Sequence, residues 1–208
     1  MAHLVDKTRV KRHADGLRAR LPREKKVGVQ DRHLFESPLD FRRVYQGRAV
    51  DFCVDDVLLP NGKKASREYM DHPGAVGIVP FVDEKNIVLV RQYRYPVREV
   101  TLEIPAGKLD PGEGRLKCVR RELREETGYC GGIIKPLITY WPTPAFANEI
   151  LYLFTARQIK PGPKHLDFDE FLDATILPFH KALSLVRDGR IKDSKTVIAL
   201  LACALWLR

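Results

Sequence analysis

The sequence predicts an α/β fold, because two kinds of apolar pattern occur in a definite order along the chain. Short β-rich runs dominate from residue 41 to residue 104, a helical pattern follows at residues 115–127, and further strands precede two terminal helices. Strands mixed with helices in this order predict a sheet packed against helices. The length of 208 residues fits one domain, or one domain with a modest extension.

Turn and capping residues mark the ends of the expected elements. The turn Pro60-Asn61-Gly62-Lys63 predicts a hairpin within the β-rich region, and Gly128 and Gly189 stand where two helices should end. Asp193 or Ser194 is expected to open the last helix. We therefore expect strands at residues 41–45, 48–59, 65–70, 75–82, 87–93, 101–104, 133–139, 150–156 and 174–177, and helices at residues 115–127, 179–187 and 194–207.

Four carboxylates stand at fixed spacing between Gly107 and Tyr129, namely Glu113, Glu122, Glu125 and Glu126. On a helix, Glu122 and Glu126 lie one turn apart on the same face, with Glu125 beside them. Like charges at this spacing repel one another, whereas a divalent cation such as Mg²⁺ binds carboxylate oxygens and brings phosphate-bearing substrates with it. The spacing therefore favours a metal site along the edge of the helix's apolar seam, which comprises Leu116, Val119 and Leu123.

The alternative is an ordinary solvated helix, because Arg120, Arg121 and Arg124 could pair with these glutamates. The flanking residues favour the metal site. A tight turn at residues 110–112 and a capping glycine at position 128 enclose the acids in a loop–helix–loop unit.

This unit resembles the Nudix box, in which Gly, five residues, Glu, seven residues, Arg-Glu, an apolar residue, any residue, Glu-Glu, any residue, Gly and an apolar residue follow one another. Tyr129 at the final aliphatic position is the only deviation. The matching residues are Gly107, Glu113, Arg121, Glu122, Leu123, Glu125, Glu126 and Gly128. The resemblance implies an α/β/α sandwich with a mixed sheet, preceded by a small antiparallel β unit. It divides the chain into a basic extension at 1–40, an antiparallel β dimerisation unit at 41–70 and a Nudix hydrolase domain at 71–208.

Further stretches are similar to the ADP-ribose pyrophosphatase branch of that family. They include REYMDHPGAV at 67–76, VLVRQYRYPV at 88–97, and Pro144, which stands sixteen residues after Gly128. In the segment WPTPAFANE, Ala145 and Asn148 replace the usual glycine and aspartate. The resemblance implies Mg²⁺-dependent cleavage of ADP-ribose to AMP and ribose 5-phosphate, with Mn²⁺ as a substitute ion. Other nucleotide sugars, such as GDP-mannose or UDP-glucose, remain alternative substrates. A nucleotide-sugar-binding regulator is a further alternative, which the intact box disfavours.

The same resemblance implies roles for individual residues. Arg121 would hold the glutamates by bidentate pairing. Glu125 would ligate a metal ion or orient a metal-bound water, and Glu113 would brace the loop. Arg67 and Arg94 match basic positions that reach the substrate, although both could be surface arginines. The implied metal ligands are the carbonyl of Ala106 and the side chains of Glu122, Glu126 and Glu170. Glu103 could be a ligand or a strand-end charge. For adenine, an aromatic slot is expected, with Phe41, Tyr45 and Phe52 as candidates.

The general base is left open, because Phe168 occupies the position of the glutamate that serves this role in relatives. Asp167, Asp169 and Glu149 are the remaining candidates. The acidic residues at 167–170 could equally form a solvated loop.

The composition of the chain indicates its cellular compartment and the partners that it could bind. The four cysteines are scattered without metal-ligand spacing, and no apolar run is long enough to span a bilayer, so a cytoplasmic enzyme with reduced thiols is expected. Residues 1–26 hold nine Lys/Arg against three acids, which accounts for +6 of the net charge of +9. This arm could bind nucleic acid, but it has no aromatic residue to stack on bases, which favours a solvated tail. The branch resemblance implies a homodimer.

Overall fold

The computed structural model describes residues 29–163 and 171–206. These residues form two compact units, one of residues 29–72 with 145–148, and one of residues 73–144 with 149–163 and 171–206. The basic arm at 1–26 lies outside the described residues. None of the described helices is long and apolar enough to cross a membrane.

The first unit is a three-stranded antiparallel sheet that follows a short 3-10 helix, η1 (Val29–Leu34). The strands are β1 (Ser37–Gln46), β2 (Asp51–Leu58) and β3 (Lys64–Asp71). The expected turn joins β2 to β3, and Gly62 adopts the left-handed conformation there with φ of 77°. The first strand begins at Ser37 rather than at residue 41, because Ser37 already pairs with Leu58, the last residue of β2. Residues 145–148 also belong to this unit, and there the Asn148 side chain accepts a hydrogen bond from the His72 amide at 2.7 Å.

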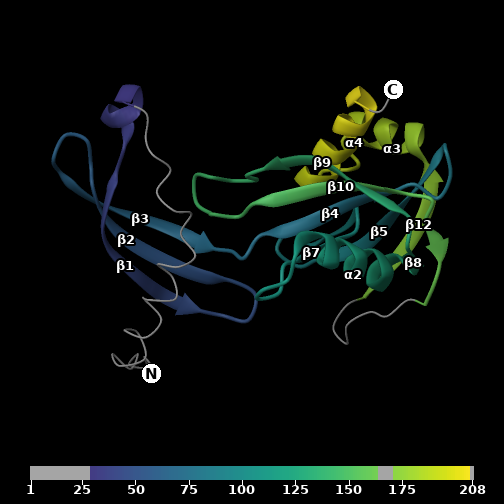
Figure 1. The fold of residues 1–208 in the computed structure, drawn as a ribbon, viewed down its shortest axis with the longest axis horizontal. Coiled ribbons are helices and arrows are strands. Elements are labelled where there is room, and N and C mark those ends of the chain that lie inside the picture. The colour runs from purple at the N-terminus through teal and green to yellow at the C-terminus, as the bar shows by residue number, and fades with distance from the viewer. Residues whose placement is uncertain (1–28, 164–170, 207–208) are drawn as a thin grey trace. The chain divides into compact units, whose positions relative to one another are not determined.

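The second unit contains a four-stranded mixed sheet, a three-stranded and a two-stranded antiparallel sheet, and three helices (Figure 1). Its central strand β4 (Ala75–Pro80) is buried throughout, and pairs parallel with β10 (Leu151–Arg157) and antiparallel with β7 (Ala106–Lys108). The other strands are β5 (Asn86–Arg94), β6 (Glu99–Glu103), β8 (Tyr129–Cys130), β9 (Ile133–Tyr140), β11 (Lys160–Pro161) and β12 (Leu172–Pro178), and the helices are α2 (Arg115–Thr127), α3 (Phe179–Arg187) and α4 (Ser194–Trp206). The strand orders are β7-β4-β10-β9, β12-β5-β6 and β11-β8.

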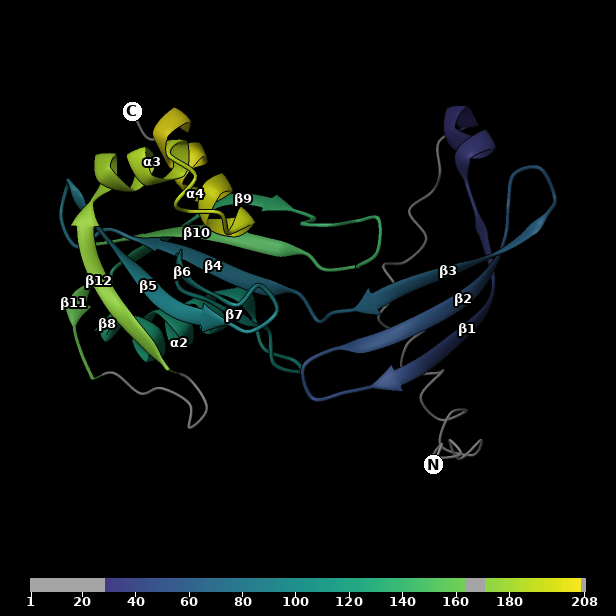
Figure 2. The ribbon, with the colours of Figure 1, turned by 180° about the vertical axis from the view of Figure 1, so that it is seen from behind.

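Helices cover both faces of the sheet, which confirms the expected α/β/α layering (Figure 2). On one face, Val76 and Ile78 of β4 pack against Val119 and Leu123 of α2. On the other face, side chains of β4, β5 and β10 share a core with α3 and α4. Alternate residues of a strand point to opposite faces, so the unbroken apolar run of β4 supplies both cores.

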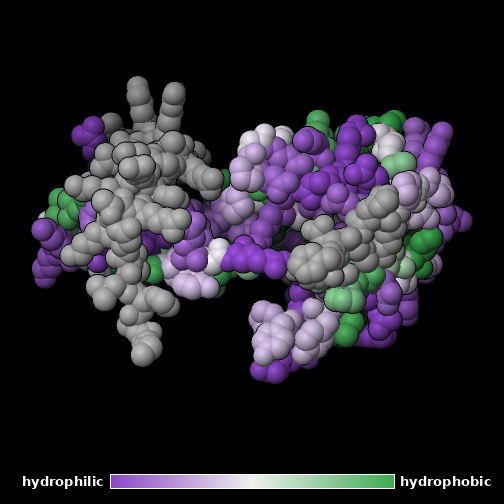
Figure 3. Space-filling view, turned by 90° about the horizontal axis from the view of Figure 1, so that it is seen from below, coloured by the Kyte–Doolittle hydropathy of each residue, from purple (hydrophilic) through white to green (hydrophobic). Residues whose placement is uncertain are grey.

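The apolar seam expected on α2 is only partly correct. Val119 and Leu123 are fully buried, whereas Leu116 is exposed and Cys118 is buried instead. Spacing alone gives the angle between side chains on a helix but not which face the strands cover. The buried face of α2 runs through Cys118, Val119 and Glu122, and Leu116 lies at its edge. Figure 3 views the molecule from below, and the surface of the second unit there is largely hydrophilic.

Candidate functional site

The loop between β6 and α2 is held to both of its neighbours by main-chain contacts. The carbonyl of Pro105 accepts a hydrogen bond from the Ile78 amide of β4 at 2.9 Å. The next amide, that of Ala106, donates to Glu126 Oε2 of α2 at 3.0 Å. The strand and the helix therefore fix the loop at adjacent residues, and a carboxylate predicted to bind metal lies directly against it.

Gly107 makes room for a second carboxylate. A Cβ atom at this position would lie 1.7 Å from Oε1 of Glu122 and 2.0 Å from its carboxyl carbon. Any side chain here would therefore displace Glu122, which is buried. The first glycine of the motif is required by this close approach, because its own φ is not in the left-handed region.

Arg121 connects three glutamates to the loop through all of its donor groups. Its Nε and Nη2 bind the two oxygens of Glu113 at 3.2 and 2.9 Å. Its Nη1 donates to Glu122 Oε1 at 2.6 Å and to Glu125 Oε2 at 3.2 Å. Nη2 also donates to the Lys108 carbonyl at 3.1 Å. A planar guanidinium has five N–H groups, and these five oxygens use them all.

The electrostatics of this cluster follow from these contacts. Hydrogen bonds from Arg121 lower the pKa of Glu113 to about 2, and the bonds to Glu113 in turn raise the pKa of Arg121. Cys118 was not singled out by the sequence, yet its thiol donates to the Lys108 carbonyl at 3.4 Å. Burial raises the pKa of Cys118 to about 12, so this thiol is a neutral packing group.

The donor set has the chemistry of a site for hard divalent cations. Glu122 and Glu126 are buried carboxylates that lie against Gly107 and Ala106, and carboxylate oxygens are the ligands that hard divalent cations prefer. Within residues 29–163 and 171–206, no group of three or more His, Cys, Asp or Glu side chains is already spaced to hold an ion. Glu122 and Glu126 are thus ligands of a suitable type that are not yet arranged around an ion. Glu170, the fourth predicted ligand, lies outside the described residues.

The chain resembles known proteins in sequence and in fold. The sequence profile of the NUDIX domain matches residues 71–200. The chain belongs to the Nudix family.

Three relatives show which Nudix proteins this chain resembles in sequence. The chain is 43% identical over 167 residues to a methanol dehydrogenase activator from Bacillus methanolicus, covering 79% of this chain and 90% of that protein. It is 37% identical over 169 residues to an ADP-ribose pyrophosphatase from Bacillus subtilis (strain 168), covering 80% and 91%. A GDP-mannose pyrophosphatase from Yersinia pestis is 35% identical over 145 residues, which cover 64% of this chain and 72% of the other.

A crystal structure of an ADP compounds hydrolase has a similar fold, with a TM-score of 0.73 and 25% identity over 83% of this chain and 94% of that one. Together with the domain match, these similarities identify the chain as a Nudix pyrophosphohydrolase.

Arg94, predicted to contact substrate, lies in the second unit with the Nudix box. Its Nε and Nη2 bind the two oxygens of Glu103 at 2.8 and 2.7 Å. Glu103 is therefore a buried ion-pair partner at the end of β6, and the charge of Glu126 adds to the effect of Glu103 in raising the pKa of Arg94.

The other predicted residues have different partners or lie outside the described residues. Arg67 belongs to the first unit and forms an ion pair with Glu36. Glu149 is half-buried and lies just before β10 in the chain. Burial of Tyr140 is the main cause of its raised pKa, and the charge of Glu149 adds to this effect. Asp169, like Asp167, Phe168 and Glu170, lies outside the described residues.

We predict that Gly107→Ala disrupts the site while leaving the fold intact. The added methyl group occupies the position of the Glu122 carboxylate, so hydrolytic activity should fall on the order of a hundredfold, with little change in Tm. Gly114→Ala is the matched control, because a Cβ there meets nothing within 4 Å and φ is −77°. Equal activity of the two variants in a steady-state assay would contradict the role of Gly107.

Glu103 also predicts how stability depends on pH. Burial alone would raise its pKa, but hydrogen bonds from Arg94 and the charge of Lys195 lower it from 4.5 to about 2. The folded-state pKa is the lower one, so the ionised carboxylate stabilises the fold above pH 4.5 and this contribution is lost as pH falls toward 2. A shift of this size corresponds to about 3 kcal/mol.

In urea unfolding, the wild-type protein should therefore lose more stability than Glu103→Gln between pH 4.5 and pH 2. A difference between the two proteins that stays constant across this range would show that the carboxylate does not titrate with a lowered pKa.

Proposed function

We propose that this Nudix enzyme hydrolyses ADP-ribose to AMP and ribose 5-phosphate with Mg²⁺ as its metal ion and Mn²⁺ as a substitute. The observation that carries the proposal is the arrangement around Arg121, which connects the box glutamates to β7 at residues 106–108. The similarity to an ADP-ribose pyrophosphatase over 80% of the chain supports the choice of substrate.

Glu122, Glu126 and the carbonyl of Ala106 would hold the metal, with Glu170 as a further ligand. The ion would neutralise the charge of the pyrophosphate and lower the pKa of a water molecule. The protein's own contribution is to fix the ligands before substrate binds. Arg121 holds Glu122 and Glu125 in place, and the amide of Ala106 does the same for Glu126.

In the proposed reaction, water attacks one phosphorus atom and the bridging P–O bond breaks, which leaves a phosphate on each product. Glu125 would orient the attacking water, and Glu149 or Asp169 would accept its proton. Arg94 would contact the substrate, because its guanidinium is held on one side by Glu103 and its side chain is 42% exposed. Arg67 is the second proposed substrate contact.

Two alternatives have support of their own. Hydrolysis of other nucleotide sugars, such as GDP-mannose or UDP-glucose, is supported by the similarity to a GDP-mannose pyrophosphatase. A regulatory role is supported by the relative named a methanol dehydrogenase activator. In both cases, the box residues would bind the same diphosphate group.

A hydrolysis screen tests the proposal. ADP-ribose, GDP-mannose, UDP-glucose, NADH and dinucleoside polyphosphates would be incubated with Mg²⁺ or Mn²⁺, and the released monophosphate measured. We expect ADP-ribose to give the highest kcat/KM. Glu126→Gln should lose activity by on the order of several kcal/mol of transition-state stabilisation without unfolding, because one ligand charge is removed and the shape is kept.

Glu84→Gln, which changes an exposed carboxylate, is the control for this loss. Near-normal kcat of Glu126→Gln at saturating metal would refute the metal assignment, and a higher kcat/KM for another nucleotide sugar would replace ADP-ribose as the substrate.

The proposal includes a cytoplasmic homodimer. All four cysteines carry free thiols, as expected in a reducing compartment. The sheet of the first unit exposes large apolar side chains that a second copy would cover, among them Leu39, Val44, Tyr45 and Phe52. Light scattering at micromolar concentration should therefore give twice the chain mass of 23.8 kDa, and a monomer mass would refute the dimer. For the arm at 1–26, we propose a solvated tail rather than a nucleic-acid-binding element.

A further inference from the structure

Glu103 is a buried charge outside the Nudix box that is bound through both of its carboxylate oxygens. Its side chain is buried, with 2% of the residue exposed, at the end of β6. Oε1 accepts hydrogen bonds from Arg94 Nε at 2.8 Å and from Thr101 Oγ1 at 2.6 Å. Oε2 accepts from Arg94 Nη2 at 2.7 Å and from Lys195 Nζ. Each oxygen therefore has two donors, so the carboxylate has a single orientation.

Lys195 brings the start of α4 to this carboxylate. Its side chain is 13% exposed, and its ammonium group also binds Asp193 Oδ1 at 2.9 Å. Two cations and two anions thus form one compact cluster, and the buried charge of Glu103 is compensated from two sides. Removing Lys195 would leave Arg94 as the only cation on this carboxylate, and the ion pair would lose its second anchor.

Thr196 ties the same helix start to the main chain of the loop. Its hydroxyl oxygen accepts a hydrogen bond from the Ile104 amide at 2.9 Å and donates to Asp193 Oδ2 at 2.5 Å. Thr196 is fully buried, so no water can replace these bonds. From Ile104 the chain continues through Pro105, held by β4, to Ala106, held by Glu126 of α2. Helices α4 and α2, on opposite faces, therefore both bind the main chain at residues 104–106.

We propose that Lys195 and Thr196 are positioning residues for the hydrolytic site, a proposal that rests on the function proposed above. Lys195 acts through Glu103 to fix the guanidinium of Arg94, the substrate-contacting side chain. Thr196 acts through Ile104 to fix the loop that presents Ala106 and receives Glu126. Adjacent residues of one helix thus control two different parts of the site, one for the substrate anion and one for the metal-binding carboxylates.

Lys195 and Thr196 should affect different kinetic constants. A guanidinium bound along one edge by a carboxylate keeps its plane, so its opposite edge meets an anion without an ordering cost. Loss of Lys195 should therefore raise KM more than it lowers kcat. Loss of the Thr196 hydroxyl should instead displace the loop and lower kcat more than it raises KM, because ligand geometry matters most in the transition state.

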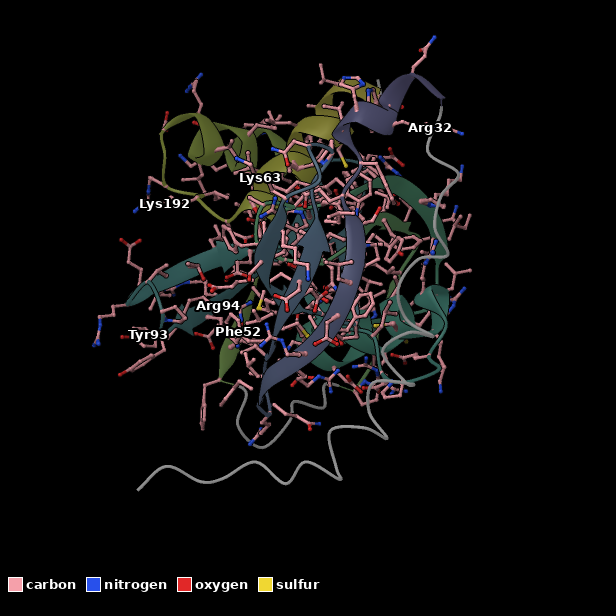
Figure 4. The ribbon with its side chains drawn as sticks, turned by 90° about the vertical axis from the view of Figure 1, so that its left-hand side faces the viewer. Arg32, Phe52, Lys63, Tyr93, Arg94 and Lys192 are labelled. Atoms are coloured by element: carbon pink, nitrogen blue, oxygen red, sulfur yellow. The ribbon has the colours of Figure 1, made fainter. Side chains whose placement is uncertain are left out.

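Matched variants of these residues test the proposal. Lys195→Met removes the charge, Lys195→Arg restores it, Thr196→Val removes the hydroxyl, and Thr196→Ser restores it. Lys192→Met is the control, because Lys192 has the same charge and also pairs with a glutamate of β6, Glu99, but its side chain is 64% exposed. Figure 4 labels Lys192 at the edge of the molecule and Arg94 further in.

Two readouts that need no turnover accompany the kinetics with ADP-ribose. NMR measures the protection of the Arg94 Nε–H group and the hydrogen exchange of the amides of residues 104–108. We expect Lys195→Met to expose the Arg94 Nε–H group to exchange and to raise KM about tenfold, with rescue by Lys195→Arg. Thr196→Val should speed exchange of the loop amides and lower kcat about tenfold, with rescue by Thr196→Ser. Lys192→Met should match the wild type.

Three results would overturn the proposal. In the first, Lys195→Met and Thr196→Val match Lys192→Met in both exchange and kinetics. In the second, both variants lower Tm and change kcat and KM alike, which indicates a merely structural role. In the third, the conservative variants fail to rescue. Should the wild-type protein hydrolyse no substrate, the proposed function fails, while the two exchange measurements still decide whether these residues hold Arg94 and the loop.

Discussion

The guanidinium of Arg121 is the interaction on which the site depends. Three box glutamates gather around this guanidinium, and like charges this close repel one another unless a cation lies between them. Arg121 binds Glu113, Glu122 and Glu125 and also the Lys108 carbonyl, so the acids and the loop share one rigid partner. No lysine could do this, because an ammonium group has three donors and no plane.

The loop at residues 103–108 is the second half of the same arrangement. It is short, and every residue from Glu103 to Gly107 is constrained by a neighbour on a different element. Ion pairs hold Glu103, the Thr196 hydroxyl holds the Ile104 amide, β4 holds Pro105, and α2 approaches Ala106 and Gly107. Breaking one of these buried contacts costs free energy, so we expect the segment to keep its geometry when a substrate binds.

Much of this could be predicted from the sequence, because the information was local. The helix at 115–127, its glycine cap and the acids on one face follow from spacing within a single segment. The start of β1 was misplaced because its pairing with β2 decides it, and Leu116 was wrongly placed in the core because the buried face of α2 runs through Cys118, Val119 and Glu122, with Leu116 at its edge. Lys195 escaped notice because its partner, Glu103, lies 92 residues away, and no local pattern marks such a pair.

The most direct test of the account is the affinity for Mn²⁺ of Arg121→Lys, measured by electron paramagnetic resonance in the absence of substrate. Arg124→Lys, on the same helix with an exposed side chain, is the control. If Arg121 prepares the carboxylates for the metal, Arg121→Lys should bind Mn²⁺ at least about tenfold more weakly, while Arg124→Lys binds it as the wild type does. Wild-type affinity in Arg121→Lys would contradict the account, because the carboxylates would then be organised without the guanidinium.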